Sequence, residues 1–197
     1  TNYGLSGSQD DWEYAFGINY DQQGMYSDAN GDLIGVDNTQ GDTMDSKSYD
    51  IFAKVAYWLN DEQRLELQVN RYELNGNNEY TSVAGNRDTH TPATSIRQTR
   101  PGQAPHNRVL TTNFKYDNYD LAGMNFSAQA YQQDFEALFG VASSNTFFDP
   151  ILAPDRMDQS QASSNKKGAK FTLTKDDLFD ETLSLTTGLD ILHDTTE

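Results

Sequence analysis

The 197-residue sequence contains no cysteine, which excludes disulfide bonds, a thiol nucleophile and a zinc–thiolate site. Basic residues are also scarce, because 14 Lys and Arg stand against 30 Asp and Glu and give a formal net charge of −16. Nucleic-acid-binding proteins usually present a basic surface. The charge balance therefore argues against a nucleic-acid partner and favours an acidic, solvated surface.

Long apolar runs are missing as well. The longest uninterrupted one extends only from Val55 to Leu59, far short of the roughly 20 residues that a membrane-spanning helix needs. The hydrophobic content of 36% and the mean hydropathy of −0.78 would, on their own, suit a polar soluble or partly disordered chain. An aromatic content of 12% argues against disorder. No signal peptide is recognisable and Thr1 is not a methionine, so we expect a mature or trimmed segment.

What the sequence does contain is a repeated alternation of apolar and polar side chains, first seen in residues 12–20. One face of an extended chain would carry Trp12, Tyr14, Phe16, Ile18 and Tyr20. A helix would scatter these side chains around its circumference, whereas a β-strand gathers them into one stripe. The same pattern predicts seven further strands, at about 1–7, 49–57, 65–70, 110–116, 124–131, 169–174 and 182–191.

The connections between the eight predicted strands alternate strictly in length. Four are short, near 8–11, 60–63, 117–123 and 175–181, and three are long, at about 21–47, 75–106 and 135–166. In an up-and-down sheet, all long connections then emerge at one end, as in outer-membrane barrels with short periplasmic turns and long extracellular loops. All five prolines (Pro92, Pro101, Pro105, Pro150 and Pro154) fall within the second and third long connections, where they interrupt no strand.

The apolar stripes themselves suit a lipid-facing surface. Only every second residue of a barrel strand meets lipid, which reconciles the stripes with the low overall hydrophobicity. The stripes are almost free of charge, and the exceptions, Arg71 and Glu73, lie at the loop end of their strand. The predicted fold class is all-β: an antiparallel, up-and-down, transmembrane β-barrel segment of about eight strands, with residues 1–197 forming part of one barrel domain in a cell outer membrane.

Several stretches resemble TonB-dependent ferric-siderophore receptors, and ferric-aerobactin-type receptors in particular. The stretches are 24–34 (GMYSDANGDLI), 45–55 (DSKSYDIFAKV), 59–72 (LNDEQRLELQVNRY) and 188–194 (GLDILHD). The resemblance implies a 22-stranded barrel, an amino-terminal plug domain and energy coupling through TonB. Neither the plug nor the site that contacts TonB is recognisable in this sequence, so the chain is expected to be an internal barrel segment. The implied function is binding and import of ferric siderophores, with no enzymatic activity, and with ferric iron present only as the siderophore complex rather than as a cofactor.

The long connections differ in charge, which points to a ligand-binding region. The second connection holds several arginines, whereas the charged residues of the first, within 21–46, are all acidic. Ferric siderophores of the carboxylate–hydroxamate type are anionic, and the planar fork of Arg donates two parallel hydrogen bonds to a carboxylate. The predicted ligand-binding residues are Tyr80, Arg87, Arg97 and Arg100. The alternative is that these arginines pair with acidic neighbours or with lipopolysaccharide phosphates.

Other features of the connections predict less specific roles. The third connection holds four aromatic residues that could cover an apolar siderophore arm: Phe135, Phe139, Phe147 and Phe148. The segment 28–32 (DANGD) is interpreted as an Asn-Gly turn, because it lacks the distal glutamate of a calcium loop. His90, His106 and His193 show no metal-ligand spacing, and we predict no metal site.

Two other interpretations remain open at this level. The chain could be a complete small eight-stranded outer-membrane barrel with a structural or adhesive role. It could also be a soluble β-sandwich binding module in which the same apolar stripes are turned inward. Long connections of about 30 residues gathered at one end are unusual for a sandwich, and they favour the barrel.

Overall fold

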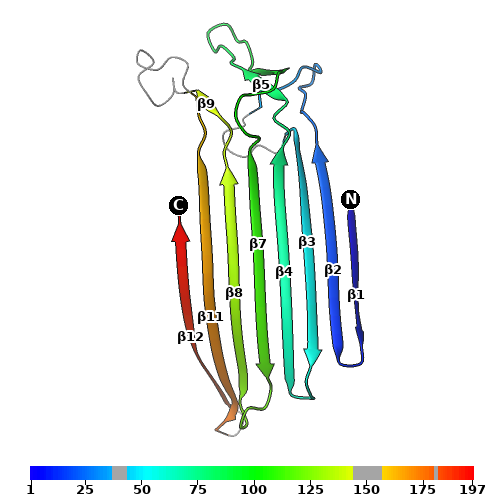
Figure 1. Cartoon of the computed structure of the whole chain (residues 1–197), viewed down its shortest axis with the longest axis vertical. Helices are drawn as coiled ribbons and strands as arrows, with labels where there is room; N and C mark the ends of the chain where they lie inside the picture. Colours follow the sequence, from blue (N-terminus) through cyan, green and yellow to red (C-terminus); the bar gives the residue numbers. More distant parts are fainter. Residues whose placement is uncertain (37–43, 144–156, 180–181) are drawn as a thin grey trace.

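The computed structural model describes residues 1–36, 44–143, 157–179 and 182–197, and it contains one large antiparallel sheet (Figure 1). The eight strands of this sheet follow one another in chain order, so that β1 and β12 form its two edges. The sheet is open and does not close into a barrel. Its strands are β1 (Asn2–Gln9), β2 (Trp12–Gln23), β3 (Ser46–Trp58), β4 (Gln63–Gly76), β7 (His106–Asn118), β8 (Asn125–Leu138), β11 (Gln161–Leu178) and β12 (Leu183–Thr196).

The all-β, antiparallel, eight-stranded prediction is confirmed, but several predicted strand ends are wrong. β8 continues to Leu138 and β11 begins at Gln161, so both extend into the third predicted long connection. Phe135, which the sequence placed in the third long connection, lies within β8. The alternation fades where both faces become polar, although the backbone ladder continues.

Two small hairpins within the long connections were not predicted. The first pairs β5 (Tyr80–Val83) with β6 (Thr94–Arg97), and the second pairs β9 (Ala142–Ser143) with β10 (Met157–Asp158). Both lie at the end of the sheet from which the long connections emerge, and the short turns lie at the opposite end (Figure 1). The predicted segregation of short and long connections is therefore confirmed. Pro92, Pro101 and Pro105 lie outside every strand, whereas Pro150 and Pro154 lie outside the described residues.

The register of the sheet separates two faces of opposite character. The face that we call the apolar face includes one continuous row across seven strands, formed by Tyr14, Val55, Leu67, Phe114, Ala130, Ala169 and Ile191. The adjacent row, on what we call the polar face, is formed by Glu13, Ala56, Glu66, Lys115, Gln129, Lys170 and Asp190. Because directly paired residues point to the same side, each row belongs to a single face.

The polar face is the more crowded of the two, and several of its charged side chains are paired. The guanidinium of Arg64 lies 2.8 Å from carboxylate oxygens of both Glu13 and Glu66. The indole Nε1 of Trp58 also donates to Glu13 at 2.8 Å. The side chain of Glu66 is only 14% exposed, whereas the next residue, Leu67, is 47% exposed on the apolar face. This is the reverse of the pattern in water-soluble proteins, where charged residues are the exposed ones.

The strands are staggered steadily across the sheet. Trp12 is the first residue of β2, and its row of direct partners reaches Leu189, the seventh residue of β12, after six steps between strands. The short turns step in the same direction from β1–β2 to β11–β12 (Figure 1). The stagger thus amounts to about one residue per step between strands. With a rise of about 3.3 Å per residue and a strand spacing of about 4.8 Å, bringing all the short turns to the same level would tilt the strands by about 35° from the vertical. Within the described residues, no helix is long and apolar enough to cross a membrane.

Candidate functional site

The three long connections pack against one another at one end of the sheet, and Asp45 joins the first to the second. Its buried carboxylate accepts hydrogen bonds from the side-chain amide of Asn77 at 2.9 Å and from the backbone N–H of Glu79 at 3.1 Å. The backbone carbonyl of Asp45 also accepts from the Asn77 backbone N–H at 2.8 Å. The backbone N–H of Asp45 donates to the carbonyl of Gly24 at 3.3 Å. Asp45 thus fixes the start of β3 to the segment that leaves β4.

A second link between these two connections involves Ser95 of β6. Its hydroxyl donates to the carbonyl of Ile34 and accepts from the N–H of Val36, both at 2.9 Å. Val36 and Ser95 are 4% and 5% exposed, and Ile34 forms an isolated β-bridge with Thr94. The hairpin of β5 and β6 is therefore held against the first connection by buried polar contacts.

Gln159 links the second connection to the third. Its side-chain oxygen accepts from the N–H of Gln103 at 3.1 Å, and its side-chain nitrogen donates to the carbonyls of Gln103 at 2.8 Å and Phe139 at 2.9 Å. The N–H of Phe139 donates to the carbonyl of Ser160 at 2.9 Å. These contacts give the long-loop end one connected layer, which is a suitable base for a binding surface.

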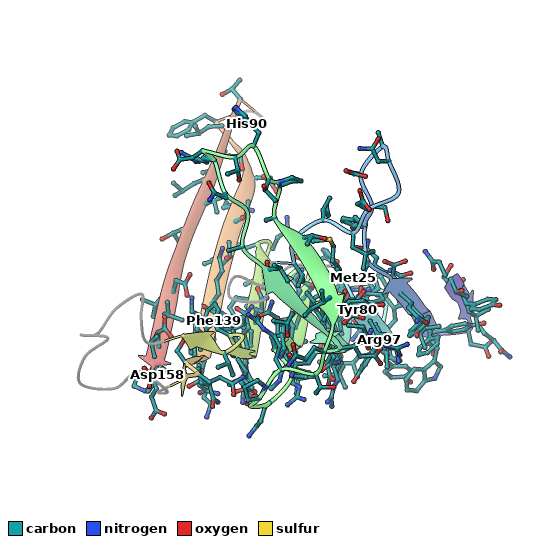
Figure 2. All side chains as sticks on the ribbon, turned by 90° about the horizontal axis from the view of Figure 1, so that it is seen from above. Met25, Tyr80, His90, Arg97, Phe139 and Asp158 are labelled. Carbon is teal, nitrogen blue, oxygen red and sulfur yellow. The ribbon has the colours of Figure 1, made fainter. Side chains whose placement is uncertain are left out.

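Two of the predicted ligand-binding residues lie side by side on this layer. Tyr80 of β5 is the direct partner of Arg97 of β6, and Figure 2 shows the two residues close together. The guanidinium of Arg97 lies 3.0 Å from the carboxylate of Glu79, and both side chains are largely exposed. Arg97 thus has the acidic partner that the alternative interpretation expected, in a pair that water weakens.

Arg100 follows β6 by three residues and differs from Arg97. Its backbone is fixed to Asn78, through its N–H to the Asn78 carbonyl at 3.4 Å and through the Asn78 side-chain amide to its carbonyl at 3.2 Å. One terminal nitrogen of its guanidinium, Nη1, is buried and has no hydrogen-bond acceptor among the described residues. A buried cationic donor without an acceptor is costly, so the Arg100 guanidinium is the group of this cluster that gains most by turning toward an anion.

Arg87 is not brought together with the other three residues. It lies in the loop at the tip of the β5–β6 hairpin, where its carbonyl accepts from the N–H of His90 at 3.3 Å. His90 lies far from Tyr80 and Arg97 in the view of Figure 2. The four predicted residues therefore form a cluster of Tyr80, Arg97 and Arg100, with Arg87 apart from it.

The remaining predicted features of the connections are distributed as follows. The segment 28–32 forms a local turn, because the Asp28 carboxylate accepts from the N–H groups of Asn30 at 2.8 Å and Asp32 at 3.0 Å, which confirms the turn interpretation. Phe147 and Phe148 lie outside the described residues. In the part of the chain that is described, no group of three or more His, Asp and Glu side chains is placed to hold a metal ion.

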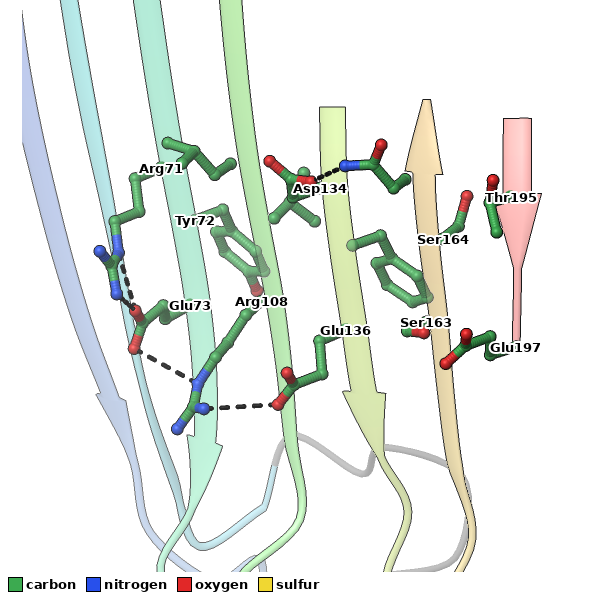
Figure 3. Close-up of a pocket in the computed structure, with 14 residues that line it drawn as sticks. Arg71, Tyr72, Glu73, Arg108, Asp134, Glu136, Ser163, Ser164, Thr195 and Glu197 are labelled. Atoms are coloured by element: carbon green, nitrogen blue, oxygen red, sulfur yellow. Dashed lines mark hydrogen bonds and ion pairs between the residues drawn. The ribbon is translucent and has the colours of Figure 1, made fainter. Parts of the chain in front are cut away.

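Sequence reasoning missed a network of charged residues on the apolar face at the loop end of the strands (Figure 3). At its centre is Glu73, which is 5% exposed and accepts from the hydroxyl of Tyr49 and from Arg71 Nε at 2.8 Å. Arg108 Nε lies 3.8 Å from Glu73, and Arg108 Nη1 lies 3.5 Å from Glu136. Only Arg71 and Glu73 had been noted, as charged exceptions in an apolar stripe.

The network continues to His106, whose Nε2 lies 2.7 Å from the same Glu136 oxygen. It thus spans β3, β4, β7 and β8, and it borders a groove of about 460 Å³. Arg108 and His106 have the sequence parity of the apolar stripe of β7, and this parity is the signal that could have predicted the network. Its arginines are neutralised by its glutamates, so the network stabilises the loop end of the sheet rather than offering free cations to a ligand.

Comparisons with models of known protein families and with solved structures found no match for this chain.

Proposed function

We propose that this chain forms part of the wall of an outer-membrane β-barrel receptor that binds ferric siderophores at its long-loop end and imports them with energy coupled through TonB. The observation that supports the membrane setting most directly is the inverted exposure of neighbouring residues. Leu67 is 47% exposed while the side chain of Glu66 is 14% exposed. Large apolar side chains on one face and paired charges on the other suit a wall between lipid and an aqueous interior.

The stagger of the strands supports the same setting. A tilt of about 35° lies at the lower end of the range of about 35–45° for transmembrane barrel strands. The open edges at β1 and β12 present backbone N–H and C=O groups that further strands of a barrel would pair. The wall function therefore accounts for the apolar face, the stagger and the two edges together.

The ligand part of the proposal rests on the cluster of Tyr80, Arg97 and Arg100. Arg100 Nη1 lacks an acceptor among the described residues, and a carboxylate oxygen of an anionic ferric chelate would satisfy it once the guanidinium turns toward the ligand. Arg97 precedes Arg100 by three residues, and its side chain is largely exposed. It can therefore exchange its ion pair with Glu79 for one with a ligand carboxylate. The fixed backbone around Asn78 and Asp45 holds this cluster in place, which limits the entropy lost on binding.

The ligand test measures binding of ferric carboxylate–hydroxamate siderophores to the receptor and to its arginine variants. We expect Arg100→Ala to weaken binding about ten- to hundredfold, because a hydrogen bond to a charged group contributes about 1.5–3 kcal/mol. Arg87→Ala is the matched control, since it removes the same charge from the same long connection outside the cluster. Equal affinity of the Arg100→Ala, Arg97→Ala and wild-type receptors would remove the ligand proposal.

The membrane test uses the two tryptophans, which lie on opposite faces. Trp58→Phe leaves Trp12, which is 51% exposed on the apolar face, as the only tryptophan of the chain. We expect its fluorescence to be quenched in vesicles whose lipids carry brominated acyl chains. A lack of quenching, together with a monomer that stays soluble without detergent, would support the soluble binding module instead.

A further inference from the structure

The apolar face is not smooth, because small side chains meet on three neighbouring strands. Thr112 of β7, Ala130 of β8 and Ala169 of β11 line a groove of about 640 Å³. Larger side chains border it, including Phe114, which is 47% exposed, and Ile191, which is 55% exposed. The volume lies within the range of about 300–1,000 Å³ that is usual for small-molecule sites.

One end of this groove is polar. Lys167 of β11 is the direct partner of Gln132 on one side and of His193 on the other, and all three residues line the groove. On the apolar face, this row is the next one after the row that contains Ala130 and Ala169. The groove therefore changes from hydrocarbon to hydrogen-bonding and basic side chains toward the long-loop end of the sheet.

The ammonium of Lys167 is available to a ligand. Lys167 is exposed and takes part in no ion pair with the described residues. The carboxylate at this end of the groove, Asp134, already accepts hydrogen bonds from Gln132 at 2.8 Å and from Asn165. His193 Nε2 lies 3.3 Å from the hydroxyl of Thr195 and stays exposed. The groove thus offers one unpaired cation and an adjacent imidazole at its polar end.

We propose that this groove binds one anionic, phosphate-bearing lipid of the surrounding membrane, with an acyl chain along Ala130 and Ala169 and the phosphate at Lys167 and His193. The proposal rests on the proposed function, because it requires the apolar face to meet lipid. An apolar channel suits a hydrocarbon chain, and a lysine beside a histidine suits the phosphate of a headgroup that carries a net negative charge. A zwitterionic lipid fits the same groove but gains less from Lys167, since its own ammonium offsets the phosphate charge.

The test is lipid retention measured by native mass spectrometry, with the protein released from nanodiscs of phosphatidylcholine that contain a minor fraction of phosphatidylglycerol. The wild-type protein is expected to retain phosphatidylglycerol preferentially. Lys167→Gln should lower this retention about fivefold, which corresponds to about 1 kcal/mol for one lysine near a membrane surface. The matched control is Lys170→Gln, three residues along the same strand on the polar face, which should leave retention unchanged.

A second variant tests the apolar part of the groove without changing its charge. Ala130→Leu fills the groove on a face where Leu is already the common residue, so folding should be preserved, and retention of both lipids should fall. Equal retention by the Lys167→Gln and Lys170→Gln proteins, or unchanged retention by Ala130→Leu, would overturn the lipid site. Quenching of Trp12 by brominated lipid, measured on the Trp58→Phe protein, separates this failure from failure of the membrane proposal.

Discussion

Gly188 of the edge strand β12 lies so close to Phe171 of β11 that a Cβ added to the glycine would come within 2.6 Å of the Phe171 carbonyl oxygen. That oxygen belongs to the backbone of the sheet, so it cannot move aside without disturbing the β11–β12 ladder. Thr172, the direct partner of Gly188, has its Cα 3.7 Å from the same Cβ position. Glycine at position 188 therefore allows β12 to pair closely with the rest of the sheet.

Gly188→Ala is expected to lower the free energy of unfolding by about 1–3 kcal/mol, because it overpacks a site whose neighbours are backbone atoms. The measurement is urea unfolding in detergent micelles, followed by the loss of β-sheet circular dichroism. Gly17→Ala is the control, because a Cβ there would meet only Phe52 Cβ, at an ordinary 3.9 Å. A Gly188→Ala protein as stable as the Gly17→Ala protein would show that the edge strand relaxes freely.

Asp45→Ala is expected to loosen the contact between the first and second long connections. The substitution leaves the Asn77 side-chain amide and the Glu79 N–H without their acceptor, at a cost of about 1–3 kcal/mol for a buried donor. Faster hydrogen exchange at the Glu79 amide and faster proteolysis of the β5–β6 hairpin are the expected readouts. Asp28→Ala is the control, because among the described residues Asp28 forms hydrogen bonds only within its own turn. Protection at Glu79 that survives in Asp45→Ala would contradict this role.

The strands were predictable from the sequence because their apolar side chains recur every second residue, and this pattern is local. It disappears where polar residues occupy both faces, as at Gln132 and Asp134 of β8 and at Asn165 of β11, and there the strand predicted for β8 ends too early and the one predicted for β11 begins too late. Extension of these strands depends on hydrogen bonds to neighbouring strands, which are set by register rather than by composition.

The candidate site was predictable in part. The charge of the second connection singled out Arg97 and Arg100, but the sequence could not show that Tyr80 pairs with Arg97 or that Arg87 lies apart. Those placements follow from a hairpin of two four-residue strands. The strands are separated by a ten-residue loop, which is too long to be predicted as a tight turn. The contact between Asp45 and Glu79 joins residues 34 positions apart, so no local pattern contains it.

Within the charged network on the apolar face, Glu73 and Glu136 are expected to contribute unequally to stability. Glu73 is nearly buried and accepts from Tyr49 and Arg71, whereas the side chain of Glu136 is 40% exposed. Glu73→Ala should lower the free energy of unfolding by about 2 kcal/mol, and Glu136→Ala by less than about 1 kcal/mol. Urea titrations at low and high salt measure both, and only the Glu136 contribution should fall strongly with salt. Equal losses would mean that the network is solvated throughout.

Leu67→Arg separates a lipid-facing sheet from a water-facing one. If the apolar face meets the membrane, an arginine in the middle of its band costs about 2–4 kcal/mol. If that face meets water, Leu67 is simply an exposed residue, and its replacement changes stability by no more than about 0.5 kcal/mol. The measurement is the free energy of unfolding from lipid vesicles. Gln68→Arg, at the next residue and on the polar face, is the control, and it should be tolerated in both settings. A Leu67→Arg protein that inserts and unfolds like the Gln68→Arg protein would show that the apolar face does not meet a membrane.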